Sequence, residues 1–304
     1  MKNILLIGLG NIGKVHFKNL SKFKNCNIYV FDKDENLTLD FINRKIQNET
    51  KFEEILNSNI IDAAIIASPS YTHVDISIIL SKKSIPHLIE KPICLSKNDY
   101  LKILNTAKKH DVFVMCGFVE RFHESIVVLK NKINKQQIIN FSSVRNSIPP
   151  SKNRELDDVK FDVLIHDLDL FNFLVENVNY KFLKISENEN FTNANYIDTD
   201  TSATFTANRV SHKKRREINI ITNKYEYHVD LIQNKIIKYE YKYYKNSENF
   251  TQPFIKTNEE VIYIDPTESI FNELEYFLDN IKLGFKNDLF KSYQFSHYAL
   301  FNKI

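Results

Sequence analysis

Tryptophan is absent from the 304 residues, and glycine and cysteine are scarce, with five and three copies. The cysteines, Cys26, Cys94 and Cys116, lie far apart inside apolar runs and form no C-x-x-C pair. This spacing argues against a disulfide scaffold and against a cysteine zinc site. We therefore expect three small, buried hydrophobic residues in a reducing compartment.

Net charge and long apolar runs are also lacking. The formal net charge of +3 is small for this length, so the chain lacks the electrostatic footprint of a nucleic-acid-binding protein. No segment approaches the roughly 18 apolar residues of a membrane span. Two glycines interrupt the apolar start, MKNILLIGLG, which argues against a signal peptide. We expect a soluble, cytoplasmic protein without nucleic-acid or membrane partners.

The first part of the chain alternates between two hydrophobic patterns. Apolar runs of strand length occur at residues 3–7, 27–31, 62–67, 86–90 and 112–116. Segments with helical spacing lie between them, at residues 12–23, 36–46, 72–82 and 97–109. Continuous apolar strands between helices are typical of a parallel sheet covered on both faces. Residues 1–117 are therefore predicted to form an α/β domain with a doubly wound, Rossmann-type parallel sheet.

The pattern changes after Gly117, and residues 118–304 are predicted to form a second domain. Helical patterns at 121–134 and around FDVLIHDLDL (161–170) flank a strand pattern at 138–145. Strand patterns then follow one another without helices, at 182–188, 200–208, 216–222, 225–231 and 235–244. Two amphipathic segments, 267–281 and 288–302, close the sequence. This order predicts an α+β domain with a mainly antiparallel, open-faced sheet.

Three of the five glycines fall in one loop, NILLIGLGNIGKVHF. Gly8, Gly10 and Gly13 have the spacing G-x-G-x-x-G between a predicted strand and a predicted helix, which is the context of a dinucleotide-binding loop. The first glycine allows the tight turn, the second lets the backbone approach a pyrophosphate, and the third packs the helix on the strand. The free amides at the helix start, around Asn11 and Ile12, are expected to hold the anion.

Asp32 ends the second predicted strand. A carboxylate there can bond both ribose hydroxyls of an adenosine and repel a 2′-phosphate, which favours NAD over NADP. Lys33 next to it weakens the exclusion of NADP. The alternative is that Asp32 has no role in cofactor binding and merely begins the turn DKDEN.

Glu90, Lys91 and Pro92 follow a predicted strand in PHLIEKPICLS. Ligands of open parallel sheets bind outside the carboxyl ends of the strands, so Lys91 is expected to reach the site. An oxidised nicotinamide carries positive charge and should lower the pKa of a neighbouring lysine, which could then exchange a proton with a substrate hydroxyl. On the residues alone, a solvated loop lysine remains the alternative.

These motifs together carry a family resemblance. GLGNIG, AAIIASPSYTHVDIS, EKP and a D-x-x-x-H helix, in this order, resemble the Gfo/Idh/MocA family of NAD(P)-dependent oxidoreductases. The resemblance implies that Lys91 is catalytic and that Glu90 and Lys91 reach both cofactor and substrate. It also implies that Ser68, Pro69 and His73 line the nicotinamide side of the site.

Asp162 and His166 are the D-x-x-x-H pair, and their spacing places them on one face of a helix. The resemblance implies that this face meets the nicotinamide, with His166 near the hydroxyl that loses its proton. Histidine suits that task near neutral pH, and Asp162 can orient it or bond a neighbouring hydroxyl. A metal site would need a third ligand, for which the sequence offers no clear candidate. A satisfied core histidine is the other alternative, and Asp167 and Asp169 receive no chemical role.

Two segments narrow the range of expected substrates. Residues 117–130 and 143–170 are similar to stretches of short family members that oxidise the 3-hydroxyl of UDP-N-acetylglucosamine, although His123 and Glu124 replace an Asn-Pro pair and the loop glycines are missing. HKKRREI (212–218) is similar to a basic segment of the same group, and a solvated strand end is its alternative. Guanidinium groups suit phosphate oxygens, and the expected substrate contacts are Arg121, Arg145, Arg154, Lys214 and Arg216.

The expected function is NAD-dependent oxidation of a sugar ring hydroxyl, at C3 of UDP-N-acetylglucosamine or a close relative, to a 3-keto sugar nucleotide for envelope polysaccharide or lipid biosynthesis. His166 or Lys91 takes the proton. The alternatives are a dehydrogenase of a free polyol or another sugar, and a non-catalytic, NAD-binding regulator, against which the joint presence of Lys91, Asp162 and His166 counts. The resemblance also implies a homo-oligomer, a dimer or tetramer, formed through the open face of the antiparallel sheet.

Overall fold

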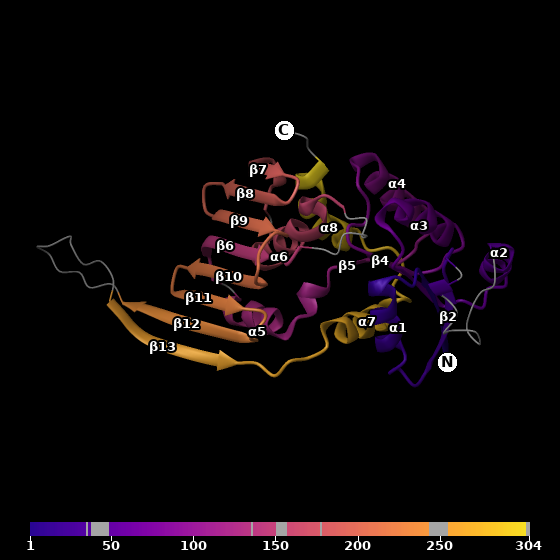
Figure 1. The fold of residues 1–304 in the computed structure, drawn as a ribbon, viewed down its shortest axis with the longest axis horizontal. Coiled ribbons are helices and arrows are strands. Elements are labelled where there is room, and N and C mark those ends of the chain that lie inside the picture. Colours follow the sequence, from indigo (N-terminus) through magenta and orange to yellow (C-terminus); the bar gives the residue numbers. More distant parts are fainter. Residues whose placement is uncertain are drawn as a thin grey trace, which may run out of the picture. The chain divides into compact units, whose positions relative to one another are not determined.

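The computed structural model describes residues 1–34, 36–37, 49–134, 136–149, 157–176, 178–242 and 255–301. The chain divides into two compact units, shown in Figure 1. The first contains Met1–Val119 and Glu268–Phe301, and the second contains Glu120–Thr267. None of the helices in the described part of the chain combines the length and the apolar character that a bilayer span requires.

The first unit is built on a five-stranded parallel sheet in the order β2-β1-β3-β4-β5. Its strands are β1 (Lys2–Ile7), β2 (Cys26–Phe31), β3 (Ala63–Ile66), β4 (His87–Glu90) and β5 (Val114–Gly117). Every residue of β3, β4 and β5 is buried, which explains their continuous apolar sequences. The predicted doubly wound sheet is confirmed, since each of the five expected strands forms.

The α-helices of this unit within the described residues are α1 (Asn11–Leu20), α2 (Glu49–Asn57), α3 (His73–Lys82), α4 (Lys97–Lys109), α7 (Ser269–Asn280) and α8 (Asn287–Phe301). A 3₁₀ turn, Ser70–Thr72, precedes α3. The expected helix at 36–46 falls almost entirely outside the described residues, and α2 was not expected. Ser96 caps α4, because its side-chain oxygen accepts a hydrogen bond from the Asp99 amide.

The two C-terminal helices pack on the first unit rather than on the second. Phe271 of α7 stacks on Phe23 at 4.5 Å between ring centroids. The hydroxyl of Tyr100 in α4 donates to the Phe290 carbonyl of α8 at 2.6 Å. This differs from the predicted boundary, which placed all of 118–304 in the second domain. Apolar faces on α7 and α8 are visible in the sequence, but periodicity does not say which surface they cover.

The second unit is built on an eight-stranded sheet in the order β13-β12-β11-β10-β6-β9-β8-β7. All neighbouring strands are antiparallel except β6 and β9. Its strands are β6 (Ile138–Asn146), β7 (Leu183–Asn188), β8 (Phe191–Ile197), β9 (Ser202–Asn208), β10 (Arg215–Thr222), β11 (Tyr225–Asp230), β12 (Lys235–Lys242) and β13 (Ile255–Tyr263). The mainly antiparallel sheet of the second domain is therefore confirmed, although β8 and β13 were not expected.

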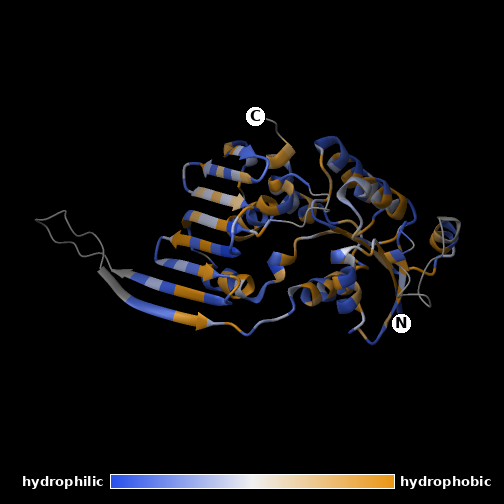
Figure 2. Ribbon diagram, in the orientation of Figure 1, coloured by the Kyte–Doolittle hydropathy of each residue, from blue (hydrophilic) through white to orange (hydrophobic). Residues whose placement is uncertain are grey.

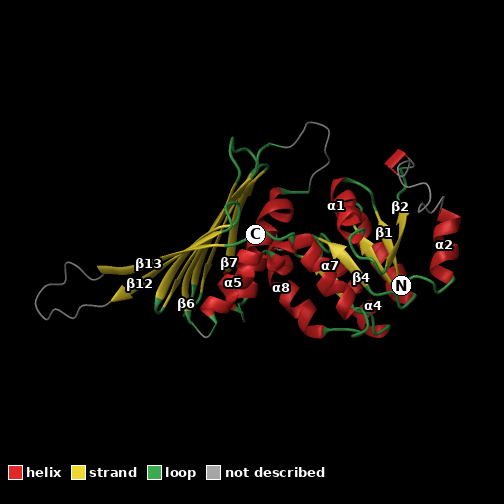
Figure 3. Cartoon of the chain, turned by 90° about the horizontal axis from the view of Figure 1, so that it is seen from below, coloured by secondary structure: helices red, strands yellow, loops and turns green. Residues whose placement is uncertain are grey.

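Helices cover one face of this sheet, as Figure 3 shows for α5 (Glu124–Ile133). A π-helix, Lys160–Leu164, runs directly into α6 (Ile165–Val175). Phe141, Phe171 and Phe205 join α6 to the sheet, with ring centroids 5.2–5.6 Å apart. Hydropathy alternates along strands such as β9 (Figure 2), because only alternate side chains face this apolar layer.

Candidate functional site

The glycine loop connects β1 to α1 and has no room for a side chain at Gly8 or Gly13. Gly8 has φ +92°, and a Cβ there would lie 2.5 Å from the backbone nitrogen of Ser68. A Cβ on Gly13 would lie 2.0 Å from the Gly8 carbonyl oxygen, so the first turn of α1 packs directly against the loop. A Cβ on Gly10 would meet no atom within 4 Å, so its Cα faces open space. The loop therefore packs tightly on the protein at Gly8 and Gly13. At Gly10 it leaves open space, where the protein backbone can approach a pyrophosphate.

The N-terminus of α1 suits an anion. Gly10 is the N-cap, no side chain caps the helix, and its first turn carries no acidic residue. The amides of Asn11 and Ile12 belong to this first turn, where backbone N–H groups have no partner within the helix. A pyrophosphate would be held by these amides and by the positive end of the helix dipole. The residues present therefore fit a dinucleotide.

Asp32 closes the other side of the loop. Its Oδ2 accepts a hydrogen bond from the Leu9 amide at 2.6 Å, and its Oδ1 accepts one from the Asp34 amide at 2.9 Å. One carboxylate thus ties the glycine loop to the end of β2. Because a carboxylate oxygen can accept more than one hydrogen bond, Asp32 can do this and still accept ribose hydroxyls.

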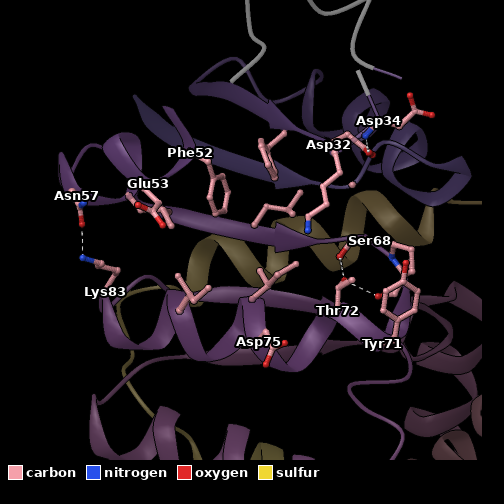
Figure 4. A pocket seen from close by; sticks show the side chains of 18 residues that line it. Asp32, Asp34, Phe52, Glu53, Asn57, Ser68, Tyr71, Thr72, Asp75 and Lys83 are labelled. Atoms are coloured by element: carbon pink, nitrogen blue, oxygen red, sulfur yellow. Dashed lines mark hydrogen bonds between the residues drawn. The ribbon is translucent and has the colours of Figure 1, made fainter. Parts of the chain in front are cut away.

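A cavity of about 870 Å³ lies beside Asp32, between α2 and α3 (Figure 4). Gly8, Asp32, Ser68 and Pro69, which the sequence assigned to the cofactor, all line it. Its apolar wall consists of Ile7, Phe31, Phe52, Leu56, Ile76 and Ile79. An apolar slot next to a strand-end carboxylate is what an adenine with its ribose requires.

His73 lies at the start of α3 and is buried. Its Nε2 lies 2.9 Å from the Ser68 carbonyl oxygen, and its Nδ1 lies 2.8 Å from the Pro92 carbonyl oxygen. The ring therefore connects the loop after β3 to the turn after β4, and it supports the cofactor edge of the sheet from inside. Ser68 is further held by a 2.6 Å hydrogen bond to Thr72 (Figure 4).

Lys91 is half-buried and directly follows β4. The Lys91–Pro92 peptide bond is cis. The preceding Glu90 points inward, where its Oε1 lies 2.6 Å from His16 Nε2 and its Oε2 accepts the Lys91 amide at 3.2 Å. Glu90 therefore supports the turn that carries Lys91, and its buried position favours an indirect role at the cofactor.

Asp162 and His166 belong to the second unit and are both partly exposed. Asp162 lies in the π-helical turn, whereas His166 lies in the first turn of α6. Short π-helical segments inside α-helices are frequently found at functional sites. Sequence periodicity alone predicted an uninterrupted helix here.

Arg209 is a neighbour of Asp162 that the sequence analysis missed. Its Nη1 lies 3.7 Å from Asp162 Oδ2 and donates to the Asp157 carbonyl at 2.8 Å. Its Nη2 donates to the Glu189 carbonyl at 3.2 Å. An almost buried arginine directly after β9 thus fixes the entry to the π-helix. Its one signal in the sequence is a lone arginine at the end of an otherwise uncharged strand, SATFTANRV.

Asp167 and Asp169, which received no role from the sequence, bind two of the predicted substrate residues. Arg145 donates from Nε to Asp167 at 2.8 Å and from Nη1 to Glu120 at 2.7 Å. Arg121 makes a two-point contact with Asp169, at 2.6 and 2.7 Å. Burial raises the pKa of both aspartates, against the lowering effect of their arginines. Each carboxylate therefore depends on its guanidinium to stay ionised.

The predicted substrate residues consequently divide into two groups. Arg145 and Arg121 are committed to buried carboxylates, which favours a structural role for them. Arg216 contacts Glu120 at 3.3 Å and has a side chain that is 45% exposed. Lys214 is exposed near the start of β10. Arg154 lies outside the described residues.

Residues 2–118 match the Gfo/Idh/MocA family, described as an oxidoreductase family with an NAD-binding Rossmann fold. The myo-inositol 2-dehydrogenase of Thermotoga maritima is 27% identical over 180 residues, which are 56% of this chain and 54% of that protein. The UDP-N-acetylglucosamine 3-dehydrogenase of Acidithiobacillus ferrooxidans is 25% identical over 170 residues, 54% and 51% of the two chains. The chain thus spans about half the length of the curated relatives it matches.

Solved structures extend the similarity of fold to nearly the whole chain. That of the UDP-N-acetylglucosamine 3-dehydrogenase from Acidithiobacillus ferrooxidans superposes with a TM-score of 0.80 at 19% identity, covering 98% of this chain and 95% of the other. A levoglucosan dehydrogenase in complex with NADH and levoglucosan gives 0.79 at 14% identity, covering 98% and 96%. At these identities the comparisons establish a common two-unit fold.

Proposed function

Because the chain belongs to the Gfo/Idh/MocA family through residues 2–118, we propose that it is a dehydrogenase that oxidises a ring hydroxyl of a sugar with NAD. We propose C3 of UDP-N-acetylglucosamine as the position oxidised. The proposal of a redox reaction rests on the features that suit a dinucleotide, which are a closely packed glycine loop, a helix N-terminus without a side-chain cap, and Asp32 beside an apolar cavity. The substrate part draws on the similarity to the Acidithiobacillus ferrooxidans enzyme in both sequence and fold.

NAD is proposed over NADP because of the charge at the end of β2. Asp32 lines the cavity, and its negative charge would face the 2′-phosphate of NADP. Lys33 lines the same cavity and offsets part of this repulsion. The bound nicotinamide supplies the hydride acceptor, so the chain itself must remove the hydroxyl proton.

Lys91 and His166 are the proposed proton acceptors. Lys91 follows a strand at the edge of the sheet where ligands of parallel sheets bind, and His166 is partly exposed on α6. We assign the proton to Lys91 or His166. Asp162, held by Arg209, is proposed to bond the hydroxyl next to the one that reacts.

Arg216 and Lys214 are the proposed contacts of the nucleotide diphosphate. Both are accessible, and a guanidinium fork suits phosphate oxygens. Arg121 and Arg145 support them indirectly, because Arg145 and Arg216 share the carboxylate of Glu120. Arg154 is retained as a sequence-based candidate.

A homo-oligomer is proposed through the helix-free face of the large sheet. Thr204 and Asn219 alternate with buried neighbours and are exposed there, together with Ile197, which is 70% exposed. A charged residue at the centre of this face, Thr204→Lys, is expected to convert the oligomer to a monomer in sedimentation velocity. An oligomer unaffected by the change would place the contact elsewhere.

The function is tested by incubating the protein with NAD and a panel of UDP-sugars, and by following the absorbance of reduced cofactor and the product mass. UDP-N-acetylglucosamine is expected to lose two hydrogen atoms. Lys91→Ala and His166→Ala are each expected to lower kcat by about 100-fold or more. Lys97→Ala, a lysine at the start of α4, is the control and should leave kcat unchanged.

Two other outcomes discriminate between the alternatives. The Thermotoga maritima relative is named for the oxidation of myo-inositol. If this protein oxidised inositols but no nucleotide sugar, the proposed substrate would be wrong and the proposed type of reaction would stand. Cofactor binding without turnover on any sugar or polyol would favour a regulator.

A further inference from the structure

Three ionisable side chains meet inside the first unit, away from the cofactor cavity. His16 comes from α1, Glu90 from the end of β4, and Glu273 from the C-terminal helix α7. His16 and Glu273 are fully buried, and Glu90 is 9% exposed. One side-chain nitrogen or oxygen from each lies within 4.8 Å of the other two. We call these three residues the carboxyl–histidine cluster.

The geometry of the cluster suits a shared proton better than a metal ion. His16 Nε2 and Glu90 Oε1 are 2.6 Å apart. Two ligands of one zinc ion, each about 2.1 Å from the metal at a tetrahedral angle, would lie more than about 3 Å apart. A separation of 2.6 Å is that of a strong hydrogen bond with a charged partner.

The surrounding backbone fixes the position of the Glu90 carboxylate. Its Oε2 accepts the backbone amide of Lys91 at 3.2 Å. Gly117, at the end of β5, leaves the space for it, since a Cβ there would lie 3.2 Å from the Glu90 carboxyl group. The charge of Glu90 is therefore linked directly to the turn that carries Lys91.

Glu273 differs from Glu90 because neither of its carboxyl oxygens has a hydrogen-bond donor. Burial raises the pKa of this carboxyl well above its usual value, and the neighbouring charge of Glu90 raises it further. The raised pKa favours the protonated, neutral form of this side chain, and one of its carboxyl oxygens lies within 4.8 Å of ligand atoms of Glu90 and His16. The other charges between α1 and α7 include the exposed pair of Lys22 and Glu268 at the start of α7.

We propose that Glu273 is a positioning residue that keeps one exchangeable proton next to Glu90, and that this proton leaves and returns as the charge near Lys91 changes. The inference rests on the proposed function, because it places an oxidised nicotinamide near Lys91. The positive charge of that ring favours a negative cluster and so releases the proton. In a low-dielectric interior such a charge is felt over several ångströms.

The proton balance of the proposed reaction is then complete. The alcohol carbon gives a hydride to the oxidised cofactor, and the alcohol oxygen gives its proton to Lys91 or His166. The nicotinamide loses its positive charge in the same step, and the proton taken from the alcohol passes on from this base to the cluster, which becomes neutral again. Glu273 thereby keeps the charge next to Lys91 nearly constant through the reaction.

The first test is infrared spectroscopy of the protein without substrate. A protonated carboxyl group has a carbonyl stretch distinct from the bands of a carboxylate. We expect this band at neutral pH in the unaltered protein and its loss in Glu273→Gln. Glu275→Gln, an exposed position on the same helix, is the matched control and should retain the band. Absence of the band from the unaltered protein would overturn the proposal.

The second test counts the protons released on cofactor binding, by calorimetry in buffers of different ionisation enthalpy. Oxidised NAD is expected to release more protons than NADH, and Glu273→Gln is expected to abolish the difference while Glu275→Gln preserves it. Equal proton release by Glu273→Gln and the unaltered protein would leave Glu273 a packing residue and overturn the proposal. So would a stoichiometric metal ion that Glu273→Gln alone removes.

The two tests separate this inference from the proposed function. Neither requires a sugar substrate, so a wrong substrate leaves both readouts intact. Failure to bind either cofactor would contradict the proposed function and, with it, the coupling of the proton to the nicotinamide, while the infrared band would still report the acid.

Discussion

Asp32 is the residue whose charge should govern the choice of cofactor. Asp32→Asn keeps a side chain that can accept the Leu9 amide but removes the repulsion of a 2′-phosphate. We expect the ratio of the NAD to the NADP dissociation constants to rise by about tenfold, equivalent to about 1.4 kcal/mol. Fluorescence titration with NADH and NADPH measures it. Asp34→Asn removes a charge from the same cavity without touching the loop, and an equal effect there would remove the special role of Asp32.

Arg145 is expected to matter for stability more than for substrate affinity. Arg145→Leu leaves Glu120 and Asp167 buried without their shared cation, which should lower the free energy of unfolding by about 3–5 kcal/mol. Arg216→Ala removes a partly exposed partner of the same Glu120 and should cost at most about 1 kcal/mol. Urea unfolding of both variants gives the comparison. Similar losses in the two would contradict the buried network.

The sequence predicted those residues whose role is set by local geometry. Gly8, Gly13 and Asp32 belong to one strand–loop–helix unit, so their spacing alone predicts a cofactor role. Arg209 and Glu273 act across long separations in the chain, and neither belongs to a local pattern. The carboxylate partners of Arg145 and Arg121 were not predicted for the same reason, because they come from other segments of the chain.

At the scale of elements, His87 links β4 to α3 and should make the first unit sensitive to acid. Its Nδ1 faces the Ile85 carbonyl at 2.9 Å and its Nε2 faces Ser77 Oγ at 2.8 Å, an arrangement that fits the neutral ring. Burial lowers the pKa of His87 to about 4. An unfolded histidine has a pKa of about 6.5. Between about pH 6.5 and pH 4 the ring is therefore protonated in the unfolded chain and neutral in the folded chain.

The stability that His87 contributes is therefore complete above about pH 6.5 and is lost as the pH falls towards 4, by up to about 3 kcal/mol. Urea unfolding at a series of pH values should show this slope in the unaltered protein. His87→Gln should flatten it, whereas His110→Gln, at the partly exposed end of α4, should not. A slope that survives His87→Gln would assign the effect to another group.

Elements were predicted where hydrophobic periodicity was strong. All five parallel strands were found because both of their faces are buried. β8 has the sequence FTNANYI, in which a threonine, Thr192, belongs to the buried face while Phe191 and Ile197 lie on the other face with two asparagines, so its apolar alternation is weak. β13, IKTNEEVIY, is an edge strand with charged residues along it, and it could not be told from a loop.

At the scale of the whole molecule, the first unit is assembled from both ends of the chain. Phe277 of α7 packs against Phe113 at 6.1 Å, and both are almost fully buried. A chain ending at residue 267 exposes this apolar surface, so its first unit should not fold stably. We expect the amides of β5 and α4 to exchange hydrogen at the rate of an unfolded chain. A chain ending at residue 301 is the control and should exchange like the full chain.

The first boundary, near residue 117, followed from the change of pattern, because the last parallel strand ends there. The return of α7 and α8 to the first unit did not follow, since their sequences specify an apolar face and not its partner. Only the structure links Phe271 to Phe23 and Phe290 to Tyr100.

The packing of α7 and α8 on the first unit also determines when that unit can be completed during protein synthesis. The glycine loop and all five parallel strands leave the ribosome before the second unit, whereas α7 and α8 emerge only after it. Until then, the surfaces that receive Phe271, Phe277 and Phe290 are exposed to water on the nascent chain. The first unit is thus begun before the second unit and completed after it.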